Sequence, residues 1–261
     1  MDARYGSWAR FESQPMALGC NGLPDGIGFR SSTQPAMKTV YHYDIEQGTD
    51  EWHALRRGVI TASTVDKLLT GTGKPANNDT SRAQLYQLLA ERITGESEPS
   101  FYNDDMARGH LLEPYARDLY DTYYEPITEC GFVTIVKDSK VIVGYSPDGL
   151  AGDDGLIEIK SPRRKTHLKS LLSNAVPSEY ISQVQTGLAV TGRKWCDFIS
   201  YAPGLPLFVH RCYPNAKLIQ QIFEAIEAAE LQLADMMSAY VAQRSNFVST
   251  EPIQPEQEIV I

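Results

Sequence analysis

Asp148, Glu158 and Lys160 are the residues whose types and spacing could do chemistry together. Residues 156–160 alternate apolar and charged side chains, which predicts a strand with Glu158 and Lys160 on one face. The Gly-Asp-Asp-Gly turn at 152–155 predicts a hairpin that could return Asp148 to that same face. Two carboxylates and one ammonium would then converge.

Such a group suits phosphodiester chemistry. Carboxylate oxygens bind Mg²⁺, which keeps several waters and needs few protein ligands. A lysine beside the ion can stabilise a metal-activated hydroxide or the charge that develops on a phosphate. The alternative is an exposed turn at Asp148 and a surface ladder of Glu158 and Lys160, because a lone Glu-x-Lys is common. The complete pattern on the expected hairpin favours a nuclease.

The elements that must position these residues follow from hydrophobic periodicity. Helices are expected near 49–54, 61–69, 81–93, 104–123, 165–174, 178–191 and 214–244. Strands are expected near 132–137, 140–145, 156–160, 195–201 and 207–213, with strand-like pattern also beginning at Lys38. Helices on both sides of a short run of strands indicate an α/β layered domain.

We expect one folded domain at 37–249. Residues 1–36 are rich in Gly, Pro and Ser and predict a flexible arm, and residues 250–261 predict a flexible tail. Met37 could be the natural start, in which case the arm would not be native; the alternative is a real tail that binds a partner.

Glu113 is a third candidate acid, one helical turn after Gly109. Apolar residues around it follow helical spacing. Spacing alone favours an exposed Glu113 or one that forms a salt bridge with Arg117 at i+4.

A candidate phosphate site lies near Arg56. Thr61-Ala62-Ser63 is expected to open a helix with Thr61 as its N-cap, and a helix N-terminus attracts anions. Ser63 and Ser146 would add hydroxyl donors. A capped helix beside a surface arginine explains these residues equally well.

Composition neither requires nor forbids nucleic acid. The net charge of −9 argues against it at first, but Arg163-Arg164-Lys165 with Lys169 form a local basic cluster. The four cysteines are scattered, as expected for thiols in a reducing cytoplasm, and the five histidines lack zinc spacing. No run of apolar residues is long enough for a membrane helix, and no signal peptide is visible.

Four blocks in order carry a family resemblance. They are Trp52 to Ser63, Gly-His-Leu-Leu-Glu at 109–113, the Asp148…Glu158-x-Lys160 pattern, and Gln183-Val-Gln. The sequence resembles the lambda exonuclease (YqaJ-type viral recombinase) family of the PD-(D/E)xK nuclease superfamily.

The resemblance implies a restriction-endonuclease-like α/β core, with a central mixed β-sheet flanked by helices. It implies a cytoplasmic, bacterial or prophage-encoded enzyme that digests one strand of duplex DNA from its 5′ end to 5′-mononucleotides. The cofactor would be Mg²⁺, with Mn²⁺ as a substitute. The partners would be double-stranded DNA ends, two further copies in a homotrimeric ring, and a phage single-strand annealing protein; no membrane is involved.

The resemblance also implies roles for single residues. Metal ligands would be Asp148, Glu158, Glu113 and the Ile159 carbonyl. Lys160 would assist deprotonation of the water and stabilise the phosphate, and Gln183 would orient the water or the scissile phosphate. The terminal 5′-phosphate would be held by Arg56, Ser63 and Ser146, although Arg57 stands where the family more often has an apolar residue. DNA would also contact Met106, as a wedge between strands, and Arg163, Arg164, Lys165 and Lys169.

Two rivals remain open. An endonuclease of restriction or repair type would share the acids and the lysine without needing a phosphate pocket at Arg56. A non-catalytic protein that binds DNA ends would not need the acids and the lysine together.

Overall fold

The computed structural model describes residues 37–97 and 104–251 of the 261-residue chain. These residues belong to one unit of the fold. The predicted arm at 1–36 lies outside the described residues, as do residues 252–261 of the predicted tail. The two domain boundaries therefore stay predictions.

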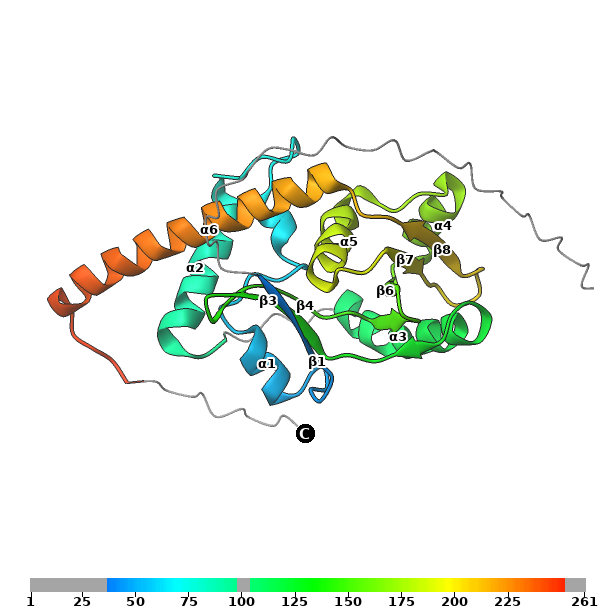
Figure 1. Ribbon diagram of the computed structural model, residues 1–261, viewed down its shortest axis with the longest axis horizontal. Helices are drawn as coiled ribbons and strands as arrows, with labels where there is room; N and C mark the ends of the chain where they lie inside the picture. The colour runs from blue at the N-terminus through cyan, green and yellow to red at the C-terminus, as the bar shows by residue number, and fades with distance from the viewer. Residues whose placement is uncertain (1–36, 98–103, 252–261) are drawn as a thin grey trace, which may run out of the picture. The chain divides into compact units, whose positions relative to one another are not determined.

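A five-stranded mixed sheet, part of the ribbon in Figure 1, carries Glu158 and Lys160 on one of its strands. Its strands, in spatial order, are β2 (Ile127–Thr128), β5 (Gly149–Ala151), β6 (Gly155–Lys160), β7 (Trp195–Ser200) and β8 (Phe208–Cys212). β6 and β7 are parallel, and the other neighbours are antiparallel. A parallel pair needs a long crossover, and here the crossover contains α4 (Arg164–Ser173) and α5 (Ser178–Thr191).

A second, antiparallel sheet has the order β1 (Lys38–His42), β3 (Phe132–Lys137) and β4 (Lys140–Tyr145). β3 and β4 are joined by Asp138 and Ser139, both with positive φ, which is the backbone that a two-residue hairpin favours. The end of β4 leads directly into the segment from Ser146 to Asp148.

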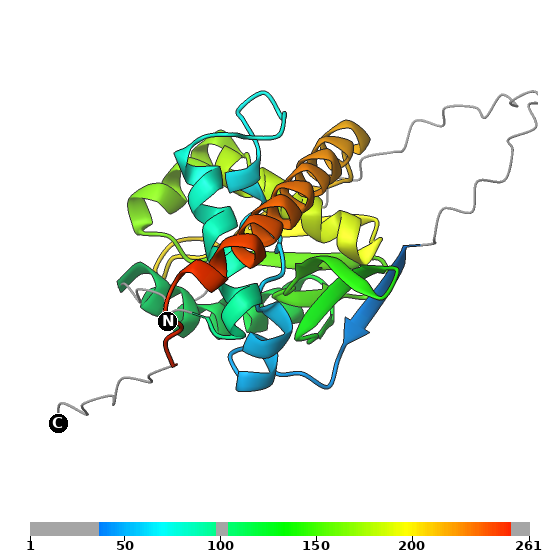
Figure 2. The ribbon, with the colours of Figure 1, turned by 90° about the vertical axis from the view of Figure 1, so that its left-hand side faces the viewer.

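The remaining helices cover the sheets. α1 (Asp50–Arg56), α2 (Asp79–Thr94) and α3 (Asp104–Tyr123) precede the hairpins, and the long α6 (Ala216–Gln243) follows β8. Two 3-10 turns span Val65–Leu68 and Arg244–Asn246. Figure 2 shows α6 crossing α2 and α5, which it contacts. No helix in the described part of the chain is long and apolar enough to cross a membrane.

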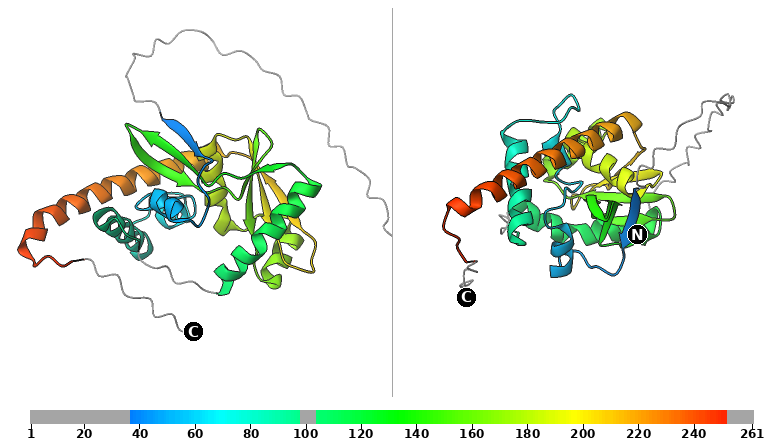
Figure 3. Two further views of the ribbon diagram at one scale, coloured as in Figure 1. Left: turned by 90° about the horizontal axis from the view of Figure 1, so that it is seen from below. Right: turned by 60° about the vertical axis from the view of Figure 1, so that its left-hand side comes forward.

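Two hydrophobic clusters bury the five-stranded sheet on both faces. On one face Leu156 and Phe198 pack with residues of α2, α5 and α6. On the other face Ile157 and Ile159 pack against Ala116 and Tyr120 of α3, which lies along the sheet in the left view of Figure 3. β6 is therefore buried on both sides, and any polar side chain on it must find a partner inside the protein.

Most predicted elements are confirmed, but the predicted helix at 61–69 is wrong. Thr61 instead forms a parallel bridge with Gly144 of β4, whose carbonyl accepts from the Ala62 amide at 2.9 Å. Only Val65–Leu68 turns as a 3-10 helix. The Thr61 amide donates to the Thr64 hydroxyl, so Thr61 does not cap an α-helix. Pairing with β4 outweighs the weak helix propensity of these β-branched residues.

Gly144 yields a test of this packing. A Cβ added there would lie 2.1 Å from the ring of the fully buried Phe132. We expect Gly144→Ala to lower the free energy of unfolding by about 1–3 kcal/mol or more, as overpacking does. Gly109→Ala is the control, because open space surrounds that helical position and alanine favours a helix by about 0.5–1 kcal/mol. Urea midpoints measure both; an unchanged midpoint for Gly144→Ala would contradict the close contact.

Candidate active site

The β5–β6 hairpin returns Asp148 to the strand that carries Glu158, as predicted. Asp148 immediately precedes β5, and Gly149 is paired with Ile157. The Asp148 Oδ2 atom accepts a hydrogen bond from the Ile159 amide at 2.5 Å. The hairpin is local in sequence, so this contact needs only the turn at 152–155.

Glu158 is a carboxylate buried in the core, with 1% of its surface exposed. Three donors from three elements satisfy it. The Tyr145 hydroxyl donates to Oε2 at 2.9 Å, the Gln183 amide donates to Oε1 at 2.5 Å, and the Lys160 ammonium lies 2.7 Å from Oε1. The predicted pair of Glu158 and Lys160 on one face is thus present, and α5 brings Gln183 to it.

Lys160 is held in its charged form. Burial lowers the pKa of Lys160, but the attraction of Glu158 and Asp148 outweighs burial and raises the pKa above its usual value. An ammonium cannot accept a proton from water, so the expected help of Lys160 with deprotonation of the water would have to come from its positive charge. In this arrangement Lys160 can donate hydrogen bonds and supply positive charge, which a phosphate would need.

Glu113 projects from α3 and is bound by Arg117, one turn later, at 2.5 Å. This is the i+4 salt bridge that helical spacing predicts. The Arg117 guanidinium also donates to the Asp148 carbonyl at 2.8 Å. Arg117 therefore joins the helix to the hairpin and places Glu113 beside Asp148.

The three acids repel one another. Burial raises the pKa of the Asp148 carboxyl well above its usual range, and the charges of Glu158 and Glu113 raise it further. Burial also raises the pKa of Glu113, against the attraction of Arg117. Within residues 37–97 and 104–251, no three His, Cys, Asp or Glu side chains converge closely enough to hold a metal ion. The acids are neighbours, but each faces a cation or a hydrogen-bond donor of the protein, such as Arg117 or Lys160.

An all-oxygen set of mutually repelling carboxylates suits a hard divalent cation. In donor chemistry, although not as a ready-made cluster of three side chains in the described part of the chain, these residues suit the Mg²⁺ that the resemblance implies. The Ile159 carbonyl belongs to the same short strand, between Glu158 and Lys160.

Arg56 and Ser146 form a second polar group. The Arg56 guanidinium donates to the Ser146 hydroxyl at 2.8 Å, and the Trp52 indole N–H donates to the same oxygen at 3.0 Å. Arg56 also stacks over the Trp52 ring, 4.3 Å from its centroid. Burial lowers the pKa of Arg56 to about 10, with Glu91 opposing this effect, so Arg56 remains a cation at neutral pH.

Ser63 does not join this group. Its hydroxyl lies 3.1 Å from the Thr61 hydroxyl, and Ser63 is exposed to solvent. The helix N-terminus that was expected to aim Ser63 at a phosphate is replaced by the bridge between Thr61 and β4.

Two cavities meet at the acids. A cavity of about 540 Å³ is lined by Lys160, Ile159 and Tyr180, and a larger one of about 1900 Å³ is lined by Arg56 and Trp52. Both cavities are lined by Met106, His110, Glu113 and Asp148. The first volume lies in the range of small-molecule sites.

Only Arg163 of the basic cluster at the start of α4 lines one of the two cavities. Arg163 lines the smaller cavity and pairs with Asp105 at 3.0 Å. Arg164 donates to the Pro203 carbonyl, and Lys165 and Lys169 are exposed on α4 without lining either cavity. Met106, 40% exposed, stands where the two cavities meet.

Sequence reasoning missed two residues of the site. Tyr145 ends a predicted strand, where an aromatic side chain is usually read as core, yet its hydroxyl holds Glu158. Trp52 belongs to the first sequence block but had no predicted role. Its indole N–H donates to Ser146 and its ring stacks with Arg56, so it positions both. The place of Tyr145 directly before Ser-Pro-Asp is visible in the sequence, but it does not distinguish this tyrosine from an ordinary core aromatic.

Comparison with known proteins gives the class of this fold and site. The YqaJ-like viral recombinase domain matches residues 51–194. This range includes Arg56, the three acids, Lys160 and Gln183. The chain belongs to this family. No curated protein matches the chain.

Solved structures agree with that assignment. An alkaline exonuclease from Laribacter hongkongensis, LHK-Exo, is 36% identical; the match covers 77% of this chain and 100% of that one, with a TM-score of 0.68. The same enzyme in complex with dAMP is 35% identical over the same shares, with a TM-score of 0.66. A phage-related exonuclease from Haemophilus somnus 129PT shares the fold at 14% identity, covering 71% and 97% of the two chains, with a TM-score of 0.51. The predicted family and fold are confirmed, and the exonuclease class is supported.

The raised pKa of Asp148 predicts how stability depends on pH. Because the pKa is raised in the folded protein, the contribution of Asp148 is favourable below its unfolded pKa of about 3.9 and is lost as pH rises through the folded value. Asp148→Asn keeps an acceptor for Ile159 and removes the charge. With EDTA present, we expect this variant to melt above wild type at pH 8, by about 2–4 °C per kcal/mol gained. The difference should shrink at pH 5; a variant that melts lower at pH 8 would contradict the repulsion.

Proposed function

We propose that this chain is a Mg²⁺-dependent 5′→3′ exonuclease that acts on the ends of linear duplex DNA. It would digest one strand to 5′-mononucleotides and leave a 3′ single strand for recombination by strand annealing. Adjacency of the two cavities carries the proposal: Arg56, which bonds to Ser146, lines the larger cavity, Lys160 lines the smaller one, and Asp148 and Glu113 line both. A site that binds a terminal phosphate one nucleotide from the reacting phosphate requires such a layout.

Asp148, Glu158, Glu113 and the Ile159 carbonyl would hold the metal, with Mn²⁺ able to replace Mg²⁺. When bound, such an ion lowers the pKa of a water and neutralises charge on the phosphate. The mutual repulsion of the acids supports this assignment, because a cation would relieve it.

The protein's own residues then have distinct tasks. Lys160, as an ammonium, would stabilise the negative charge that grows on the phosphate oxygens during in-line attack by water. Gln183 would hold Glu158 in position through the bond that joins them. The bond from phosphorus to the 3′-oxygen would break, leaving a 3′-hydroxyl on the released nucleotide and a 5′-phosphate on the shortened strand.

Two further expectations belong to this proposal. A homotrimeric ring would place three copies of Arg163, Arg164, Lys165 and Lys169 around duplex DNA and keep the charge of −9 per chain outside. A phage single-strand annealing protein would receive the 3′ strand. The mass of the protein in solution would test the expected homotrimer.

Lys160→Ala tests the chemistry. Loss of one preorganised donor to the transition state typically costs about 10²–10³ in kcat, so we expect cleavage of linear duplex with Mg²⁺ to fall at least a hundredfold. Binding to DNA ends should persist, because Asp148, Arg56 and Ser146 remain. Lys217→Ala, at an exposed position of α6, is the control. Wild-type turnover by pure, folded Lys160→Ala would refute the assigned role.

The end of the substrate tests polarity. We expect 5′-phosphate ends to be digested faster than 5′-hydroxyl ends, and Arg56→Ala to reduce this ratio by about 10–150-fold, equivalent to a charged hydrogen bond of about 1.5–3 kcal/mol. Arg57→Ala is the matched control, since Arg56, and not Arg57, donates to Ser146. Cleavage of covalently closed circles, or equal rates on both ends in wild type, would favour the endonuclease rival. Absence of cleavage with retained end binding would favour the binding protein.

A further inference from the structure

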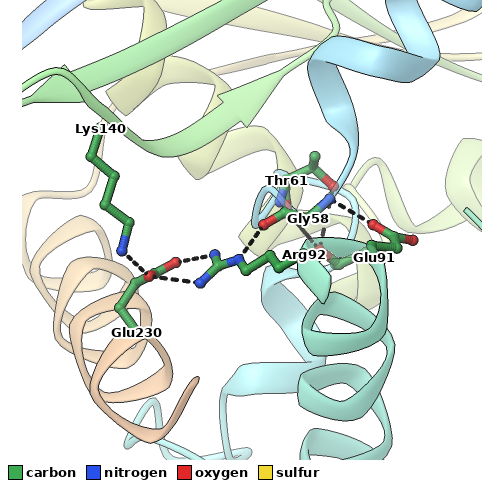
Figure 4. Close-up of polar contacts among 7 residues, drawn as sticks. Gly58, Thr61, Glu91, Arg92, Lys140 and Glu230 are labelled. Carbon is green, nitrogen blue, oxygen red and sulfur yellow. Dashed lines mark hydrogen bonds and ion pairs between the residues drawn. The ribbon is translucent and has the colours of Figure 1, made fainter. Parts of the chain in front are cut away.

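Two consecutive residues of α2 hold both polar groups of one buried glycine. The Gly58 amide donates to the Glu91 carboxylate at 2.7 Å, and the Gly58 carbonyl accepts from the Arg92 Nε atom at 2.7 Å (Figure 4). Gly58 lies two residues beyond Arg56, in the turn that leaves α1. A buried N–H and C=O without partners would each cost free energy, so Glu91 and Arg92 determine the path of this turn.

The turn strongly favours glycine. Gly58 has a φ of +66°, and an added Cβ would lie 2.7 Å from Cγ of Arg92. The Val59 amide donates back to the Arg56 carbonyl at 3.0 Å, which closes the turn on the last residue of α1. Because this turn is tight, the position of Gly58 constrains the position of the Arg56 backbone.

Arg92 is itself anchored. Its guanidinium makes two bonds to Glu230 of α6, at 2.6 and 3.1 Å, and Lys140 of β4 lies 2.6 Å from the same carboxylate (Figure 4). Although burial raises the pKa of Glu230, its bonds to Arg92 and Lys140 outweigh burial and lower it, so Glu230 stays ionised at neutral pH. β4 ends next to Ser146. The network therefore connects the two segments that supply Arg56 and Ser146.

α1 needs this support. It has seven residues, none of them fully buried, and helices that short are marginal without tertiary contacts. Besides the bond from Arg56 to Ser146, α1 is anchored by the Trp52 indole near its middle and by the Gly58 turn at its end. Displacement of about 1 Å in a binding group can cost on the order of a hundredfold in rate.

We propose that Glu91 and Arg92 are positioning residues that hold the Gly58 turn so that Arg56 faces the 5′-phosphate of the substrate. This inference rests on the proposed function of Arg56. Glu91 holds the turn as a hydrogen-bond acceptor for Gly58, and its negative charge is not needed for that task. Neither residue contacts the DNA in this proposal.

The measurement is the ratio of initial rates on 5′-phosphate and 5′-hydroxyl duplex ends. Glu91→Ala removes the acceptor, and we expect the ratio to fall about tenfold while the 5′-hydroxyl rate changes less than threefold. Glu91→Gln keeps an acceptor without the charge and should retain the wild-type ratio within about twofold. Arg92→Leu should behave like Glu91→Ala. Arg82→Leu, which breaks an exposed pair with Asp79 on the same helix, is the control.

The outcomes separate the two proposals. A wild-type ratio of one, or an Arg56→Ala ratio equal to wild type, removes the 5′-phosphate site and this inference together. A wild-type preference that Arg56→Ala abolishes but folded Glu91→Ala and Arg92→Leu preserve overturns the positioning role alone. Equal loss in Glu91→Gln and Glu91→Ala overturns it as well, because charge would then be the cause. If Arg92→Leu does not fold, the two Glu91 variants still decide, since the bonds between Arg92 and Glu230 do not involve Glu91.

Discussion

Burial of the Glu158 carboxylate is the constraint on which this structure depends. β6 is packed on both faces, so an ionised side chain on it is far from solvent. Breaking one partner from a buried charge costs about 3–5 kcal/mol. Tyr145 comes from the other sheet, Gln183 from the crossover helix, and Lys160 from the same strand. The need to satisfy one carboxylate thus ties both sheets and α5 together at the site.

The same constraint crowds negative charge at the site. Asp148 and Glu113 are brought beside Glu158 at a cost, which appears as raised pKa values that have burial as their first cause. The positive charges of Arg117 and Lys160 offset part of that cost. Functional sites often retain such unfavourable charge arrangements, because the arrangement that binds and reacts is not the one that maximises stability.

Local patterns predicted what local contacts determine. The helices at 104–123 and 178–191 have the predicted bounds, and the hairpin returned Asp148 to β6 as its turn required. Contacts with distant segments were not predicted: Thr61 pairs with Gly144, which replaces the predicted helix with a bridge and leaves Ser63 bonded to Thr61 and not to the Arg56–Ser146 pair. Helical spacing predicted the bond between Glu113 and Arg117, but only the family resemblance placed Glu113 beside Asp148. Tyr145 could not be separated from an ordinary core aromatic.

The bond between Arg92 and Glu230 joins residues 138 positions apart, and the Thr39 hydroxyl bonds to the Val190 carbonyl across 151 positions. Contacts of such separation form slowly, because the entropy of closing a long loop is lost before the contacts can stabilise the fold. During synthesis at about 5–20 residues per second, α2 emerges many seconds before its partner on α6. The acids from α3 and the β5–β6 hairpin are thus translated well before Glu230, which anchors Arg92 and through it the Gly58 turn. The order of translation itself delays completion of the site until nearly the whole domain has left the ribosome.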